Sequence, residues 1–195
     1  EVETNSSTRD GVDYMARAAH YEQSREWDPF TFPFVFARRA RHYKEAFGAT
    51  GADLARVVAK AYGNANRNPQ AQMHTVKMSV ESAETISDHN AYFLHDPEYR
   101  EHIKHSDCTT FTDGGSAVIL ATEAGLEALS ISRSQCTEIV SYGHSVAGLG
   151  KETDPTRLAN MARAAQSAYT DAGITSSDVG LVEVHDCFSI NELQH

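Results

Sequence analysis

The amino-acid sequence predicts an α/β protein whose first hundred residues are mainly helical. The prediction depends first on the last third of the chain, where a helix, a short strand, a four-residue motif and another helix follow one another. It depends also on two apolar or β-branched runs, residues 116–121 (SAVILA) and 136–142 (CTEIVSY), which are typical of strands. Ligands of α/β folds collect at the carboxyl ends of strands, so the motif after the strand at residues 181–184 is the first candidate site.

Helical spacing of apolar residues dominates the amino-terminal half. The predicted helices cover residues 12–23, 37–47 and 51–63. Thr50, with Asp53 three residues later, has the pattern of an N-terminal helix cap. Pro29 and Pro33 interrupt the periodicity of the aromatic segment between the first two helices, and residues 64–73 are expected to form a loop with an Asn-Pro turn.

The carboxy-terminal half carries clear helix boundaries. Helices are predicted over residues 122–129 and 155–172 and from about residue 190 onward. Asp154 is expected to cap the second of these, with Pro155 in its first turn and Gly173 after its end. Ser189 and Glu192 have the spacing of a capping box at the start of the last helix.

The charge balance argues against a protein whose main role is to bind nucleic acid. The 195 residues include 17 Lys and Arg against 27 Asp and Glu, a net charge of −10, whereas neutralising phosphates requires clustered cations. One local cluster of cations is either a solvated helix face or an anion site for a phosphorylated substrate. Its members are Arg38, Arg39, Arg41 and Lys44. No apolar run in the sequence reaches the length of a membrane span.

The cysteine content indicates a reducing environment. Cys108, Cys136 and Cys187 are too few and too scattered for a disulfide framework. Cys136 lies within a predicted strand and is expected to be a core residue. Residues 1–15 show no targeting segment and lack an initiator Met, which we expect of a fragment or a processed start.

The motif His185-Asp186-Cys187-Phe188 joins the last predicted strand to the last helix. On an extended loop the side chains of His185 and Cys187 face the same side. Free N–H groups at the start of the following helix tend to lower the pKa of a thiol, and an imidazole can orient a water or donate to a developing oxyanion. From the residues alone a second interpretation stays open, in which Cys187 is a small buried hydrophobe and His185 is satisfied by backbone carbonyl groups.

The segment VEVHDCFSINEL resembles the H-D-C-F segment of sterol-carrier-protein-type thiolases. Three further stretches resemble the same family in the same order. They are the helix and turn at residues 48–73, the segment at residues 106–125, and the helix and strand at residues 156–184. The resemblance covers roughly residues 33–193, and by it the chain is identified as a member of the thiolase family.

This resemblance implies a five-layered αβαβα thiolase fold, seen only in part. It assigns a mainly helical loop domain on the acyl-CoA side to residues 1–106, the end of the amino-terminal half to residues 107–135, and the start of the carboxy-terminal half to residues 136–195. It also implies that His185 helps to hold a water in an oxyanion hole and that Cys187 is the acid/base of the carbon–carbon bond step.

The function implied by the resemblance is that of an acyltransferase of fatty-acid or sterol side-chain metabolism. Such a thiolase acts on acyl-CoA or 3-ketoacyl-CoA, by thiolytic cleavage or Claisen condensation, usually as a homodimer. The CoA thioester is the substrate, and neither a tightly bound cofactor nor a metal is expected. Relatives of this kind occur in peroxisomes, glycosomes, mitochondria and the bacterial cytoplasm.

Two expected parts of a thiolase are absent from the sequence. The family's nucleophilic cysteine lies in a C-x-S segment upstream of the loop domain, but no cysteine precedes Cys108. The family's G-H-P loop follows H-D-C-F, whereas Gly143-His144-Ser145 precedes it. The sequence is therefore expected to be an internal fragment that is inactive alone.

Two other classes of function stay open. One is a CoA-thioester-binding protein or steroid side-chain aldolase without thiolysis, which needs no acylated cysteine. The other is a metal-binding or interaction domain that shares only local patterns with the family. His102, His105 and Cys108 have spacing that a zinc site could use, although a fourth ligand is not evident.

Overall fold

The structure, a computed structural model, describes residues 14, 16–18, 20, 22, 26–148 and 154–195. The helix predicted over residues 12–23 falls largely outside these ranges. The chain forms two compact units. Unit 1 consists of Glu1–Thr110, Ala147–Ala159 and Glu183–His195, and unit 2 of Phe111–Val146 and Asn160–Val182. This division follows compactness in space, so the domain boundaries after residues 106 and 135 remain predictions.

Helix α3 spans Thr31–Phe47 and begins earlier than predicted. Pro33 lies in its first turn, where a missing N–H removes no helical hydrogen bond, so this proline does not interrupt the helix. The predicted end is confirmed. Gly48 adopts a left-handed conformation with φ of 70°, and its N–H donates to the carbonyl oxygen of Lys44 at 2.9 Å.

Helix α4 spans Gly51–Ala65 and confirms the predicted cap. The Asp53 carboxylate accepts hydrogen bonds from the Thr50 N–H at 2.8 Å and from the Thr50 hydroxyl at 2.7 Å. The helix continues past Gly63, its predicted end, because glycine lowers helix propensity without breaking a helix. In the following loop the side-chain oxygen of Asn68 accepts the N–H two residues further on at 3.0 Å, as expected for an Asn-Pro turn.

Unit 1 is completed by short helices. They are α5 (Val80–Glu84), the 3-10 helices η1 (Arg100–His102) and η2 (His105–Asp107), and α8 (Ser189–Gln194). Helix α8 confirms the helix predicted from about residue 190. None of the helices in the described ranges combines the length and apolar character that crossing a lipid bilayer requires.

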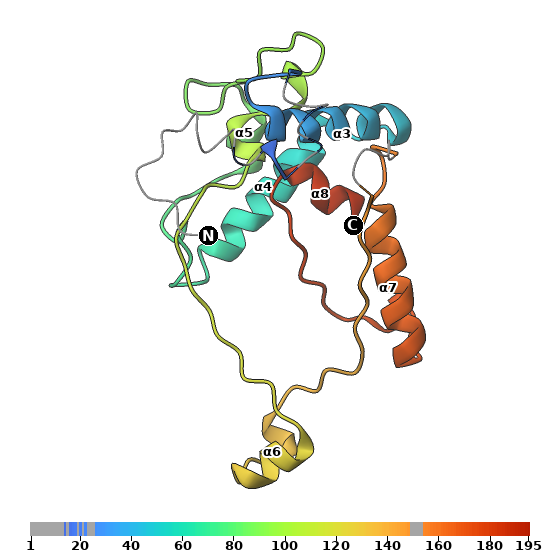
Figure 1. The fold of residues 1–195 in the computed structure, drawn as a ribbon. Helices are drawn as coiled ribbons and strands as arrows, with labels where there is room; N and C mark the ends of the chain where they lie inside the picture. The colour runs from blue at the N-terminus through green and yellow to red at the C-terminus, as the bar shows by residue number, and fades with distance from the viewer. Residues whose placement is uncertain (1–13, 15, 19, 21, 23–25, 149–153) are drawn as a thin grey trace. The chain divides into compact units, whose positions relative to one another are not determined.

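The main hydrophobic core of unit 1 lies where α8 meets α3 and α4 (Figure 1). Its buried residues are Phe34, Ala37, Ala40, Leu54, Leu94, Ile103, Phe188 and Ile190. The apolar stripe predicted on α4 contributes Leu54 to this core. Because Phe188 and Ile190 flank the start of α8, the core fixes the carboxyl end of the H-D-C-F motif.

Unit 2 contains the remaining helices. They are α6 (Glu123–Ala128), η3 (Arg133–Gln135), most of α7 (Ala159–Ala172) and η4 (Ser176–Asp178). Helix α6 confirms the helix predicted over residues 122–129. Helix α7 starts later than predicted, because the carboxylate of Asp154 accepts the Thr156 N–H at 2.9 Å in a preceding turn instead of capping the helix. Gly173, with φ of 68°, follows the end of α7 as predicted.

An extended segment runs along α7 within unit 2. The guanidinium of Arg163 donates to the hydroxyl oxygen of Ser145 at 3.3 Å. A Cβ placed on Gly143 would lie 1.8 Å from the carbonyl oxygen of Ala164, so only glycine allows this close approach of the backbones. The Gly143-His144-Ser145 sequence thus has a packing role on α7.

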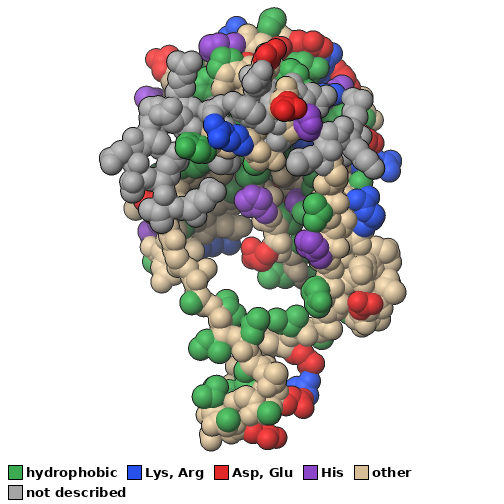
Figure 2. Space-filling view, in the orientation of Figure 1, with side chains coloured by type: hydrophobic (Ala, Val, Ile, Leu, Met, Phe, Trp, Pro, Cys, Tyr) green, Lys and Arg blue, Asp and Glu red, His purple; other side chains and the backbone are tan. Residues whose placement is uncertain are grey.

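The predicted strands are extended but unpaired in the described part of the chain, so layered α/β architecture is not confirmed. Residues 116–121, 136–142 and 181–184 form no strand and no bridge there, and the two isolated bridges in the described ranges join Ser87 to Asn90 and Cys108 to Phe188. Their exposed apolar side chains include Val118, Ile119, Leu120, Ile139, Val140, Leu181 and Val182 (Figure 2). Cys136, predicted to be a core residue, is exposed as well. A helix completes its own hydrogen bonds, whereas a strand needs a neighbour. This difference explains why predicted helices are observed in the described ranges and predicted strands are not.

Candidate functional site

The H-D-C-F motif lies in unit 1, between extended backbone and the first turn of α8. His185 is exposed, whereas Asp186 and Cys187 are partly buried. Successive side chains of an extended segment point to opposite sides. The backbone bends at Cys187, and Asp186 lines a pocket that neither His185 nor Cys187 lines.

Phe188 anchors the motif to the core of unit 1. Its ring stacks on the ring of Phe36 in α3, with centroids 4.1 Å apart and 13° between the planes. Its backbone pairs with Cys108 in an isolated antiparallel bridge, and the Thr109 N–H donates to the carbonyl oxygen of Cys187 at 2.9 Å. The backbone that carries the Cys187 thiol is therefore held by aromatic packing and by residues 108–109.

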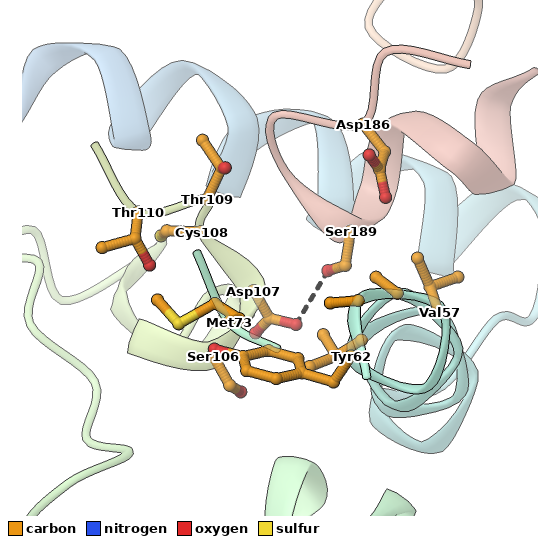
Figure 3. Close-up of a pocket in the computed structure, with 13 residues that line it drawn as sticks. Val57, Tyr62, Met73, Ser106, Asp107, Cys108, Thr109, Thr110, Asp186 and Ser189 are labelled. Carbon is orange, nitrogen blue, oxygen red and sulfur yellow. Dashed lines mark hydrogen bonds between the residues drawn. The ribbon is translucent and has the colours of Figure 1, made fainter. Parts of the chain in front are cut away.

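A buried carboxylate holds the start of α8. Asp107 is 2% exposed and accepts the Lys104 N–H at 2.9 Å, the Lys104 ammonium at 3.1 Å and the Ser189 hydroxyl at 2.8 Å (Figure 3). The predicted capping box of α8 is therefore wrong. The hydroxyl of Ser189 donates to Asp107, and Glu192 forms an ion pair with Lys60. The capping box does not form because the helix begins at Ser189 itself and its N-cap residue is Phe188, which has no side-chain acceptor.

A pocket of about 160 Å³ lies between α4, residues 106–110 and the H-D-C-F motif (Figure 3). Its lining residues are Val57, Val58, Ala61, Tyr62, Ala65, Met73, Ser106, Asp107, Cys108, Thr109, Thr110, Asp186 and Ser189. Helix α4 provides an apolar wall, and the other side carries carboxylates and hydroxyls. No Lys or Arg is among these lining residues, so the pocket suits an apolar group with a few polar atoms better than a phosphate.

The electrostatic surroundings of Cys187 differ from those predicted. Burial raises the pKa of the thiol, and the nearby Asp186 carboxylate raises it further. The backbone N–H groups of Cys187 and Phe188 lower the pKa, but they are outweighed. The prediction that the helix start lowers this pKa is therefore wrong, and the thiol is protonated near neutral pH. Burial also raises the pKa of Asp186.

The proposed zinc ligands are engaged in other contacts. The ring of His105 stacks on Phe93 with centroids 4.7 Å apart, and the thiol of Cys108 donates to the carbonyl oxygen of Lys104 at 3.5 Å. Burial raises the pKa of Cys108 to about 12, which keeps it neutral. Across the described ranges no group of three or more His, Cys, Asp or Glu side chains is arranged to hold a metal ion. All three cysteines are free thiols.

The basic cluster on α3 binds groups of the protein itself. Arg41 forms ion pairs with Glu45 and Glu98. Arg39 donates to the side-chain oxygen of Gln194 in α8 at 3.5 Å, and burial lowers its pKa. These contacts favour a structural use of this helix face over the anion site that the sequence left open.

Phe36 and Asp107, which position the motif, were not predicted from the sequence. The signal for Phe36 is its four-residue spacing from Phe32, which becomes visible once Pro33 is placed in the first turn of the helix. For Asp107 the sequence carries no such signal, because its partner Ser189 lies 82 residues further along the chain.

Known proteins similar to this chain are thiolases and their relatives. Residues 141–195 match the family described as thiolase C-terminal domain-like. The chain is 32% identical to an acetyl-CoA acetyltransferase of Methanothermobacter thermautotrophicus, over 85% of the chain and 41% of that protein. It is 24% identical to human sterol carrier protein 2, over 83% of the chain and 28% of that protein. It is 28% identical to the benzoylsuccinyl-CoA thiolase subunit BbsB of Thauera aromatica, over 81% of the chain and 38% of that protein.

These similarities confirm the resemblance that the sequence motifs indicated. The chain spans about two fifths of the length of the first curated relatives it matches. The family match contains α7, the H-D-C-F motif and α8, which are the segments with the most specific resemblance. Residues 141–195 thus match the thiolase C-terminal domain-like family, and over most of its length the chain is similar to proteins named acetyl-CoA acetyltransferase, sterol carrier protein 2 and thiolase subunit.

Proposed function

We propose that the full-length protein is a thiolase-type acyltransferase that cleaves 3-ketoacyl-CoA with CoA, or forms it by Claisen condensation, in fatty-acid or sterol side-chain metabolism. The observation that carries the proposal is an exposed imidazole and a partly exposed thiol in the H-D-C-F motif of a chain similar to proteins named as acetyltransferase and thiolase. The CoA thioester is the substrate, and this chemistry requires no tightly bound cofactor. The family resemblance adds a homodimer to the proposal.

Cys187 is the acid/base in this reaction. In the cleavage direction the enzyme nucleophile bonds to the keto carbon, and the bond between that carbon and the α-carbon breaks. The electron pair of the broken bond stays on the α-carbon as the acetyl-CoA enolate, and the thiol gives its proton to that carbon. The acyl group on the nucleophile then passes to CoA, and the proton released from the CoA thiol replaces the one that Cys187 gave up. In the condensation direction the thiolate removes the same proton, and the enolate attacks the acylated nucleophile. The raised pKa of Cys187 supports the first role, because it keeps the thiol protonated near neutral pH.

His185 stabilises the negative charge that develops on the thioester oxygen. An enolate carries that charge on oxygen, so a donor or a donor-held water must be in place before the bond changes. The exposed imidazole of His185 is free to face such a substrate, while the neighbouring Phe188 keeps the backbone in place by stacking on Phe36.

The relative named sterol carrier protein 2 favours one second candidate function. This is a CoA-thioester-binding protein or a steroid side-chain aldolase, in which no enzyme cysteine becomes acylated. The two candidates differ in one intermediate. A thiolase incubated with acyl-CoA carries a covalent acyl group that mass spectrometry detects on the intact protein, whereas the second candidate carries none.

The test of the proposed function is thiolysis by the full-length protein with Cys187→Ala. We expect this variant to lose the CoA-dependent release of acetyl-CoA from a 3-ketoacyl-CoA, and to keep transfer of the acetyl group from acetyl-CoA to the enzyme nucleophile, because Cys187 acts on carbon only. Cys136→Ala is the matched control, since Cys136 is exposed and lies in unit 2, and it is expected to react as wild type.

Two results contradict the proposed function. Near-normal thiolysis by Cys187→Ala removes the acid/base assignment from this residue. A full-length wild-type protein that releases no acetyl-CoA from any 3-ketoacyl-CoA, and acquires no acyl group, is not a thiolase.

A further inference from the structure

An ion pair with almost no solvent contact lies beside the H-D-C-F motif. The side chains of Lys104 and Asp107 are 6% and 1% exposed, and Nζ and Oδ2 are 3.1 Å apart. A buried ion pair contributes little net stability, because both groups lose their hydration. Stability alone therefore does not explain why these charges are buried here. The hydrogen bond from the Ser189 hydroxyl to Asp107 indicates another role.

The two carboxylate oxygens of Asp107 serve different partners. Oδ2 accepts both hydrogen bonds from Lys104, which is a local contact. Oδ1 accepts the hydroxyl of Ser189 at 2.8 Å, which joins two distant parts of the chain. Ser189 is the first residue of α8 and follows Cys187 by two positions. The orientation of Asp107, set by Lys104, therefore determines where the motif enters the helix.

We propose that Asp107, held by Lys104, is a positioning residue for Cys187, whose thiol it keeps in a partly buried place through the hydrogen bond to Ser189. The catalytic consequence rests on the proposed acid/base function of Cys187, whereas the placement of the thiol does not. The backbone contacts of Cys108 and Thr109 with the motif also help to hold Cys187 in place, since both residues directly follow Asp107 in the chain.

The surroundings of the thiol make its placement measurable. Burial is the largest cause of the raised pKa of Cys187, and Asp186 is the next. Cys108, another titratable group close by, stays neutral because burial raises its pKa to about 12. A motif released from Asp107 exposes the Cys187 thiol to water, so its pKa falls towards the ordinary value and its thiolate fraction near neutral pH rises.

Ser189→Ala in the full-length protein tests the proposal, because it removes one contact and leaves the Lys104–Asp107 pair intact. The measurement is the rate at which iodoacetamide alkylates Cys187 across a range of pH, read from the mass of the peptide that contains it. We expect faster alkylation at neutral pH, by about threefold for each half unit by which the pKa falls. In the same variant kcat for thiolysis falls, while KM and acyl transfer to the enzyme nucleophile stay near wild type.

Matched controls separate positioning from a general loss of stability. Ser79→Ala removes a hydroxyl that caps α5 and is expected to leave the Cys187 profile unchanged. Cys136, which is exposed, serves as a reference thiol within each sample. If Ser189→Ala does not fold, the double variant Lys104→Gln with Asp107→Asn removes both buried charges together, and it is expected to speed the alkylation of Cys187 in the same way.

The alkylation rates decide whether Asp107 positions the Cys187 thiol. A Cys187 alkylation profile that equals wild type in Ser189→Ala, or in the double variant where that is used, overturns the proposal. So does a loss of acyl transfer in parallel with kcat, because general unfolding produces that result. The alkylation rate does not depend on thiolase activity. A wild-type protein that shows no thiolysis therefore refutes the proposed function, while the alkylation of Cys187 still tests its positioning by Asp107.

Discussion

The thiol of Cys187 is kept protonated by the place that it occupies in unit 1. Burial and the Asp186 carboxylate raise its pKa, and the N–H groups at the start of α8 do not compensate. A protonated thiol is a poor nucleophile, but it is a suitable donor to a carbanion. The residue is therefore better suited to proton transfer at carbon than to covalent attack on a thioester.

His185 is expected to contribute through its ring N–H groups. In the full-length protein, His185→Ala removes the donor to the developing oxyanion and should lower kcat for thiolysis by about 10²–10³. His144→Ala is the control, since His144 is also exposed but belongs to the segment that packs along α7. Steady-state kinetics of the two variants provide the test. Equal losses in both, or no loss for His185→Ala, exclude the assigned role.

The residue types of the site could be predicted from the sequence, but their environment could not. From residue chemistry alone, proton transfer and oxyanion binding by His185 and Cys187 were one of two open interpretations, and the resemblance of the H-D-C-F motif favoured it. The burial of Cys187 depends on Phe36 and on residues 108–109, which are distant in the sequence. The direction of the pKa shift was therefore predicted wrongly, since only the local N–H groups were visible.

At the scale of elements, α4 and α8 form the support of the motif. They are in contact, and Lys60 of α4 forms an ion pair with Glu192 of α8. Leu54, on the buried face of α4, is 1% exposed and belongs to the same core as Phe188. The apolar face of α4 therefore stabilises both the helix and the backbone of the H-D-C-F motif.

Leu54→Ala is expected to lower the free energy of unfolding by about 2–5 kcal/mol, because it leaves a cavity in the core that holds Phe188. Lys60→Ala, on the exposed face of the same helix, is expected to cost about 1 kcal/mol or less. Urea unfolding of the full-length protein measures both. Comparable effects of the two substitutions would mean that the core does not support this region.

Helices were predicted more successfully than strands for a physical reason. The cap at Thr50 and the helix ends at Gly48 and Gly173 depend on neighbouring residues only, and all three are observed. The capping box at Ser189 was wrongly predicted because the helix begins at Ser189 and its N-cap residue is Phe188, while the Ser189 hydroxyl donates to the distant Asp107. Strands need a partner, and residues 116–121 have none in the part of the chain that the structure describes.

At the scale of the whole molecule, the chain is similar to thiolases and spans only part of their length. It spans 41% of the length of the archaeal acetyl-CoA acetyltransferase and carries the H-D-C-F motif. Neither the family's C-x-S cysteine nor its G-H-P histidine is in these 195 residues. The proposed reaction needs the C-x-S cysteine, the G-H-P histidine and the H-D-C-F motif together, so the activities are proposed for the full-length protein.

We propose above that Cys187 carries the proton at the α-carbon of the thioester. Exchange of the methyl protons of acetyl-CoA for deuterium in D2O tests this step without any bond between carbons being made or broken. The full-length wild type and Cys136→Ala should catalyse the exchange, and Cys187→Ala should show only the rate without enzyme while it still accepts an acyl group. Exchange by Cys187→Ala at the wild-type rate would contradict the account.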